Sequence, residues 1–259
     1  MHTARLLAVA LLSIIVTTLV WADDSSGNSF SKGAHGRKLS GCQGYASAGF
    51  GQRTLPIGSG DNYRGNVGIP YGSNIIDIPA HAADDYRHVV QFNGVPGDSW
   101  TVVIWNKYEP DGVMNGWFGN ACHDFHLTGS QTRFFAFDDD SQGGWAAARG
   151  SHIPLDTNGG YATTWGEFDF GSCINLGWSG FDVSAIAAQG AQLEVQGMKI
   201  CDVVTEVCSS VSKSASRIEN AYTFATRYEN GIGGNLAPGP VRLQVWIDYV
   251  DRDTRDEIH

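Results

Sequence analysis

The sequence of 259 residues predicts a mainly β protein, built as a single β-sandwich domain with one helix. Short runs of β-branched and aromatic residues are separated by clusters of Gly, Asn and Asp, which is the composition of strands and turns. The run at residues 241–250 alternates apolar and polar side chains with a period of two, as a strand with one buried face does. Many of the 33 glycines lie between such runs, so we expect long, shaped loops.

Six runs carry the strand signal. In chain order they are residues 88–92, 100–106, 133–138, 163–170, 193–200 and 241–250. Only residues 209–228 have helical spacing, because apolar side chains recur there every three or four positions, from Val211 to Ala225. A serine cluster could cap its start and Gly231 could end it. We therefore expect one helix at residues 209–228, lying on an antiparallel β scaffold.

Residues 1–22 have the pattern of a secretory signal peptide: a basic start, an apolar run at residues 6–20 and a small residue before the acidic Asp23. The run is shorter than the ~18 residues that a membrane-spanning helix needs. We therefore expect a secreted, extracellular protein. The other expected segments are a disordered leader, the β domain and a charged tail, at residues 23–40, 41–250 and 251–259.

The net charge of −10 argues against nucleic acid and anionic membranes as partners, because both reward clustered Lys and Arg. The five cysteines of a secreted chain are expected to be mostly paired. Cys201 and Cys208 are close enough to close a short loop, and Cys122 and Cys173 are candidates for a long-range bridge. Cys42 would then be the odd one, although spacing alone does not fix the pairing.

The strongest candidate site is the run WGEFDF at residues 165–170. On a strand, Phe168 and Phe170 would face the core, and Glu167 and Asp169 would share the other face with Trp165. The two carboxylates would lie roughly 6 to 7 Å apart at ~3.3 Å per residue, a separation that suits acid and base groups on a glycosidic bond. A solvated strand face is the simpler alternative.

Two other polar motifs carry weaker signals. The three carboxylates at residues 138–140 lack the alternate-residue ligand pattern of a calcium loop, so an acidic turn is the favoured interpretation. His123 and His126 would point to opposite faces of a strand, and no further ligand follows at a recognisable spacing. We therefore expect no metal and no cofactor.

Exposed aromatic side chains could stack on sugar rings. Four tryptophans sit beside glycine in loop-like or strand-end contexts: Trp117, Trp145, Trp165 and Trp178. Each could instead belong to the core. At least one exposed aromatic platform is expected among the four.

Long motifs in order give the chain a family resemblance. They are GFGQRT at 49–54, YRGNVGIPYGSNII at 63–76, WTVVIWNKYEPDG at 100–112, AFDDDSQGGWAAARG at 136–150, GGYATTWGEFDF at 159–170, GWSGFDVSAI at 177–186 and EVQGMKIC at 194–201. With these motifs the chain resembles the Asp f 4-like family of secreted fungal allergens. The resemblance implies secretion and binding by human IgE, and it supplies no biochemical activity.

More distantly, the order of strands resembles thaumatin-like proteins, which are β sandwiches with an acidic cleft used on β-1,3-glucans. That resemblance implies a sandwich of thaumatin-like character, with Glu167 and Asp182 at cleft positions. A shared fold does not by itself establish function.

Three functions follow as hypotheses. The first is a non-catalytic protein associated with the fungal cell wall that binds β-glucan or a related polysaccharide through Trp165, Glu167, Asp169 and Asp182. The second is a weak endo-β-1,3-glucanase with Glu167 as acid and Asp182 or Asp169 as base. The third is a secreted effector that acts on host proteins.

Overall fold

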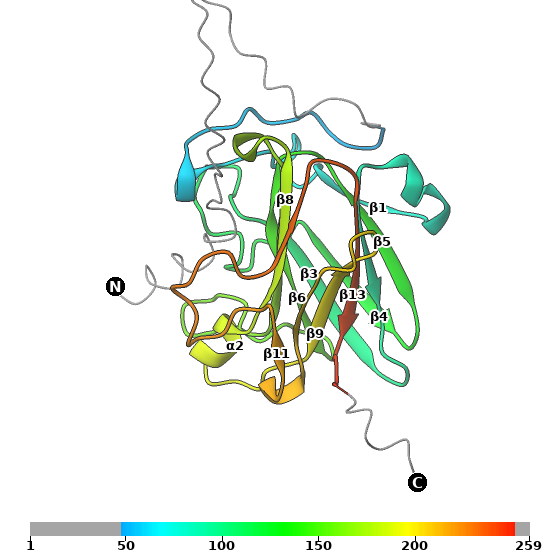
Figure 1. Cartoon of the computed structure of the whole chain (residues 1–259), viewed down its shortest axis with the longest axis vertical. Coiled ribbons are helices and arrows are strands. Elements are labelled where there is room, and N and C mark those ends of the chain that lie inside the picture. Colours follow the sequence, from blue (N-terminus) through cyan, green and yellow to red (C-terminus); the bar gives the residue numbers. More distant parts are fainter. Residues whose placement is uncertain (1–47, 252–259) are drawn as a thin grey trace, which may run out of the picture.

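The computed structural model describes residues 48–251, and these form two β-sheets packed face to face (Figure 1). One sheet has seven strands in the order β1-β5-β2-β13-β9-β10-β11, and the other has six in the order β12-β8-β7-β6-β3-β4. Neighbouring strands are antiparallel except for β2 and β13, which are parallel. The predicted mainly β, two-sheet architecture is therefore confirmed.

The strands of the seven-stranded sheet are β1 (Ile75–Ile78), β2 (His88–Asn93), β5 (Thr132–Phe137), β9 (Met198–Asp202), β10 (Cys208–Val211), β11 (Ile218–Glu219) and β13 (Val241–Ile247). Those of the six-stranded sheet are β3 (Ser99–Asn106), β4 (His123–Thr128), β6 (Ser141–Arg149), β7 (Trp165–Ser172), β8 (Trp178–Ser184) and β12 (Gly234–Leu236). Short helical turns lie between them: η2 (Gly60–Asn62), η3 (Ala80–Asp85), η4 (Cys173–Asn175), η5 (Lys213–Ala215) and α2 (Ile186–Gly190).

Each of the six predicted runs contains a strand, with two differences in length. Within residues 193–200, only the part from Met198 onward is a strand, because β9 begins there. The run at residues 241–250 ends as a strand at Ile247. Within β13, the predicted alternation holds, since Val241, Leu243 and Val245 are buried and Trp246 is 36% exposed.

The predicted helix at residues 209–228 is wrong. β10 and β11 occupy its first half, and β10 pairs with β9 from Cys208 to Val211. Ser214, Ala215 and Asn220 have positive φ angles, which an α-helix of L-residues does not accept. The apolar residues spaced three and four apart thus lie in a hairpin and in turns, and not on one face of a helix. The α-helix labelled α2 is five residues long, lies earlier in the chain at Ile186–Gly190, and is seen to the left of the strands in Figure 1.

The core lies between the sheets and is dominated by aromatic rings. Phe92, Trp145 and Phe168 are almost fully buried, and the ring of Trp145 is stacked on that of Phe168 with centroids 5.7 Å apart. The six-stranded sheet also has a second apolar cluster on its outer face, which includes Trp105 and Trp165. Because this sheet is buried on both sides, its central strands lack the simple alternation of a half-exposed strand.

One disulfide prediction is confirmed and the other is wrong. Cys201 and Cys208 face each other across β9 and β10 and form a disulfide. Cys122 is a free cysteine, whereas Cys173 is disulfide-bonded, so these two do not pair. Cys122 immediately precedes β4, and Cys173 immediately follows β7. In the sheet order these strands are three positions apart, about 14 Å at ~4.8 Å per strand, which is too far for a disulfide.

The predicted signal peptide and leader at residues 1–40, Cys42, and all of the charged tail except Asp251 lie outside the described residues. From residue 48 to residue 251, none of the helices has the length and apolar character needed to span a membrane.

Candidate functional site: two buried acidic clusters

Buried carboxyl groups lie in two places. One is on strands β7 and β8 of the six-stranded sheet, and the other directly follows β5 of the seven-stranded sheet. We call Glu167, Asp169 and Asp182 the acidic face, and Asp138, Asp139 and Asp140 the paired cluster. All six residues are at most 5% exposed. Carboxylates are seldom buried to this extent without partners, so the surroundings of each cluster indicate its role.

The acidic face forms because β7 alternates as predicted. Phe168 and Phe170 enter the core between the sheets, while Trp165 joins the apolar cluster on the outer side. Glu167 and Asp169 lie on that outer side as well, because residues two apart on a strand share a face. The prediction that Trp165, Glu167 and Asp169 share one face is confirmed.

Pairing between strands adds Asp182 to the same face. In the antiparallel pair β7 and β8, Glu167 lies directly opposite Asp182. On the other side of β7, β6 places Gly144 opposite Glu167 and Gln142 opposite Asp169. Directly opposed side chains have Cβ atoms about 5 Å apart, so Glu167 and Asp182 are in contact range.

Burial raises the pKa of all three carboxyl groups. The pKa of Glu167 is raised well above its usual value by burial and then by the neighbouring Asp182 carboxyl. Burial also raises the pKa of Asp182 well above its usual value, and it raises that of Asp169 from 3.8 to about 7. The acidic face therefore holds protons at pH values where exposed carboxyl groups have lost them.

Several oxygen atoms here have no hydrogen-bond partner among the described residues. Both carboxyl oxygens of Asp182 are in this position, as are Asp169 Oδ1 and Gln142 Oε1. A buried polar atom without a partner costs about 1–3 kcal/mol, and groups of strongly perturbed acids are typical of functional sites.

Lys107 is the cation that acts on the acidic face: its charge lowers the pKa of Glu167 and of Asp169, against the effect of burial. Burial lowers its pKa to about 8, against the opposing influence of Asp169, Asp61 and Glu167. Its Nζ donates a hydrogen bond to the backbone oxygen of Asp61 in η2 at 3.1 Å. A pocket of about 480 Å³ lies beside this contact, because its lining includes Asn62 and Tyr108, the chain neighbours of Asp61 and Lys107.

Three of the four predicted aromatic platforms are core residues. Trp117, Trp145 and Trp165 are 5%, 0% and 3% exposed, so none of them presents a ring face to a polysaccharide. Trp145 fills the interior between the sheets, and the other two pack in the outer apolar cluster. Trp178 is 38% exposed at the start of β8 and is the member of the four that keeps an accessible surface.

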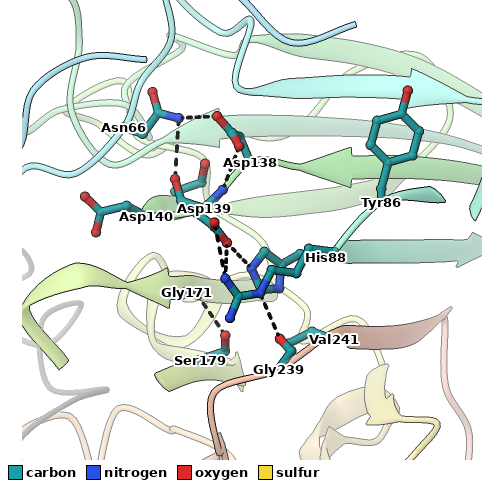
Figure 2. Close-up of polar contacts among 12 residues, drawn as sticks. Asn66, Tyr86, His88, Asp138, Asp139, Asp140, Gly171, Ser179, Gly239 and Val241 are labelled. Carbon is teal, nitrogen blue, oxygen red and sulfur yellow. Dashed lines mark hydrogen bonds and ion pairs between the residues drawn. The ribbon is translucent and has the colours of Figure 1, made fainter. Parts of the chain in front are cut away.

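The paired cluster is built around Asp139. Its carboxylate accepts hydrogen bonds from Arg87 Nη1 at 3.1 and 3.2 Å and lies 2.8 Å from His88 Nε2 (Figure 2). These contacts lower the pKa of Asp139 despite its burial, and burial lowers the pKa of His88. A neutral imidazole therefore donates from Nε2 to an ionised carboxylate.

The other two members of the paired cluster are also bonded. Asp138 accepts from Arg53 Nε at 2.6 Å and from Asn66 Nδ2 at 3.0 Å. Asp140 points away from Asp139 in Figure 2, and its carboxyl accepts from the Tyr63 hydroxyl at 2.7 and 2.9 Å. Burial raises the pKa of Asp140 to about 6. The acidic turn expected at residues 138–140 is present at Asp139 and Asp140, and cations and hydroxyls from distant segments bury it.

A β-bulge in β7 makes room for the paired cluster. The register of β7 and β8 shifts between Asp169 and Ser172, and Gly171 within it has a φ of 59°. A Cβ atom on Gly171 would lie 2.8 Å from Asp139 Oδ1 and 2.9 Å from His88 Nε2. Glycine is therefore required here both by its φ angle and by the approach of the Asp139 and His88 side chains.

Sequence reasoning missed three residues of the acidic face and its border: Trp105, Lys107 and Gln142. Trp105 and Lys107 belong to the run WTVVIWNK, whose unbroken apolar character is a signal for a strand buried on both faces. Gln142 had no such signal, since its place opposite Asp169 depends on the pairing of β6 with β7.

Within residues 48–251, no group of three or more His, Cys, Asp and Glu side chains is arranged to hold a metal ion. His123 Nε2 lies 2.8 Å from the backbone oxygen of Ile75, and His126 Nδ1 lies 3.1 Å from Thr101 Oγ1.

Comparison with known proteins gives one family and two similar proteins. Residues 73–247 match the model of the Allergen Asp f 4-like domain. The chain is 54% identical to Allergen Asp f 4 of Aspergillus fumigatus over 205 residues, which are 79% of this chain and 64% of that protein. It thus spans less than two thirds of the length of this relative. A solved structure, the protein elicitor MoHrip2 from Magnaporthe oryzae, is similar with a TM-score of 0.38 at 12% identity, over 63% of this chain and 99% of that one.

The family match covers both sheets and all six carboxyl groups described above, because it extends from just before β1 to the end of β13. The chain therefore belongs to the Asp f 4-like allergen family.

Proposed function

We propose that this chain is a secreted, non-catalytic protein that binds β-glucan or a related neutral polysaccharide of the fungal cell wall through the acidic face. The observation that carries the proposal is the set of buried acceptor oxygens without partners, above all the two of Asp182. Hydroxyl groups of a neutral sugar are donors that could satisfy these acceptors. The net charge of −10 disfavours an anionic polymer.

Access to the acidic face requires a local movement, since Glu167 and Asp169 are each 5% exposed. η2 is the candidate for this movement. It buries no side chain of its own, and it is joined to Lys107 by the bond from Nζ to the Asp61 oxygen. Displacing Lys107 would connect the acidic face with the pocket beside Tyr108, where a sugar chain could enter.

The test is co-sedimentation of the purified protein with insoluble β-1,3-glucan, chitin and cellulose. Glu167→Ala and Asp182→Ala remove the acceptor oxygens and should each weaken retention on the bound polysaccharide about tenfold, the effect of losing about one hydrogen bond. Glu206→Ala, at an exposed position, is the matched control and should bind as the unchanged protein does. No pelleting with any of the polysaccharides, or equal retention of all variants, would overturn the proposal.

A glycoside hydrolase is the second candidate, favoured by the facing pair of Glu167 and Asp182. Because burial raises both pKa values, the pair keeps a proton to higher pH than exposed carboxyl groups do, which favours a general acid. Reducing ends measured in the same tubes separate the two functions. Sugar release that is lost in Glu167→Gln would establish hydrolysis, and pelleting without release would establish binding alone.

Binding by human IgE is proposed from the family, since the relative from A. fumigatus is named as an allergen and shares 54% identity. Immunoblots with sera from patients sensitised to that relative test it. Loss of signal after absorption of the sera with this protein is the expected result.

A further inference from the structure

A second cavity, of about 550 Å³, contains none of the residues of the acidic face. Its floor is formed by Ile186 and Ala187 in α2, and its walls come from residues 155–158, 190–193 and 224–228. This volume lies within the range of pockets that hold small organic molecules.

The walls of this cavity expose large apolar side chains. Leu155 is 55% exposed, Leu193 43%, Phe224 41% and Tyr228 58%. Four such side chains around one cavity form an apolar surface that water solvates poorly, so an apolar ligand would gain free energy by covering it.

One cation lies among these apolar side chains. The Arg227 guanidinium carbon is 4.1 Å from the centroid of the Phe224 ring and 4.3 Å from that of Tyr228. In the described part of the chain, no carboxylate lies within ion-pair distance of it. Arg227 also covers one face of each ring, which leaves these aromatics less suited to stacking on a sugar.

Asp156 is the acidic group in the lining, and it is held within its own loop. Its Oδ1 accepts hydrogen bonds from the backbone nitrogens of Asn158 at 2.7 Å and Gly160 at 2.9 Å. Its contacts therefore shape the loop, whereas Arg227 Nη1 donates to the backbone oxygen of Phe224 and, among the described residues, the guanidinium meets no anion.

From the apolar walls and this cation, we propose that the cavity binds an amphipathic carboxylate, a molecule with an apolar body and one anionic head such as a fatty acid. The apolar body covers Leu155, Leu193 and Phe224, and the head accepts hydrogen bonds from Arg227. A guanidinium and a carboxylate form the strongest such pair available to a protein side chain.

The experiment is a fluorescence titration of the full secreted protein with dansyl-undecanoic acid, with its methyl ester as the neutral probe. Saturable binding of the acid is expected, with at least about tenfold weaker binding of the ester and of the acid to Arg227→Gln. Arg217→Gln, which replaces an exposed arginine outside the cavity, should leave the affinity unchanged.

Two further variants separate charge from shape. Phe224→Ala should weaken both probes, because it removes an apolar wall. Asp156→Asn keeps an acceptor for the loop and removes the negative charge, so it should bind the acid as tightly as or more tightly than the unchanged protein. Equal affinity for acid and ester, no effect of Arg227→Gln, or displacement of the probe by soluble β-glucan would overturn the proposal; the last result would assign the cavity to sugars.

Discussion

The acidic face and the paired cluster each contain three carboxyl groups buried to the same extent, yet their surroundings differ. The paired cluster receives Arg53, Arg87, His88 and Tyr63. The acidic face has Lys107 as its cation only at the range of electrostatic influence, and among the described residues both carboxyl oxygens of Asp182 and one of Asp169 have no hydrogen-bond partner. Asp139 thus stays ionised through its ion pairs, whereas burial raises the pKa values of the acidic face so that it holds protons instead.

Under the proposed function, this difference separates a structural role for the paired cluster from a ligand-binding role for the acidic face. Asp139 joins β2 to the end of β5 and to β7, because its partners Arg87 and His88 stand at the start of β2 and Gly171 lies against the same atoms. Such a cluster fixes the positions of strand ends. The acidic face costs folding free energy and has kept its hydrogen-bonding capacity open, which is the pattern expected where a ligand completes a site.

The largest effect is expected from Asp139→Asn, which keeps the size of the side chain and removes its charge. Arg87, whose side chain is 10% exposed, would then lose the charge of Asp139 beside it. Removing one partner of a buried ion pair costs about 3–5 kcal/mol of unfolding free energy. Urea denaturation at neutral pH measures it, with the exposed Asp84→Asn expected within about 0.5 kcal/mol of the unchanged protein. Equal denaturation midpoints for the two variants would contradict the structural role of Asp139.

At the acidic face, replacing a carboxyl group is expected to raise the unfolding free energy, the opposite of the effect at Asp139. Because the pKa of Asp169 is about 7 in the folded protein and 3.8 ordinarily, the folded state binds a proton that the unfolded chain releases between these values. The unfolding free energy should therefore fall as the pH rises from about 4 to about 7 and then level off. Asp169→Asn removes this loss, and the shift from 3.8 to about 7 corresponds to a stabilisation of up to about 4 kcal/mol at pH 8.

Denaturation of Asp169→Asn at pH 5 and pH 8 checks this expectation. The change in unfolding free energy between pH 5 and pH 8 should be smaller in the variant than in the unchanged protein. An identical difference would show that Asp169 does not titrate in this range. Asp139 provides the internal contrast, since its lowered pKa makes its contribution disappear only as the pH falls through the acid range.

The smallest effect is expected from Arg53→Gln. The Arg53 side chain is 40% exposed, and Asp138 would keep its bonds from Asn66 Nδ2 and from the backbone nitrogen of Asp139. The expected loss is about 1 kcal/mol at low salt and less at high salt, since a partly exposed pair is screened. Denaturation at two ionic strengths measures both values. A loss as large as that of Asp139→Asn would mean that Arg53 holds the cluster as firmly as Arg87.

Local pattern predicted much of the fold. The run at residues 88–92 became β2, and the alternation in residues 241–250 correctly identified the buried face of β13, because side chains of a strand alternate whatever strand lies beside it. The same kind of pattern failed at residues 209–228. There the disulfide hairpin of β9 and β10 and the positive φ angles at Ser214 and Ala215 overrode a helical spacing.

The candidate site was predicted in part. Glu167 and Asp169 share a face as their spacing of two requires, and the register of β7 and β8 places Asp182 opposite Glu167. The tryptophans were harder to place. A glycine beside Trp145 suggested a flexible turn, but Gly144 and Gly166 leave room for indole rings on opposite faces of the sheet. Sequence alone does not distinguish a glycine that bends the chain from one that admits a neighbour.

By itself, the sequence determined the mainly β class, the buried face of individual strands, the short disulfide loop of Cys201 and Cys208, and membership of a family. These properties depend on residues close together in the chain or on long ordered motifs. Only the tertiary structure decided that Asp138 and Asp139 pair with Arg53 and Arg87 and that Asp139 meets His88, while no described residue donates a hydrogen bond to Asp182. The physical reason is that the free energy of a buried carboxyl group depends on charges and donors brought to it by segments more than fifty residues away.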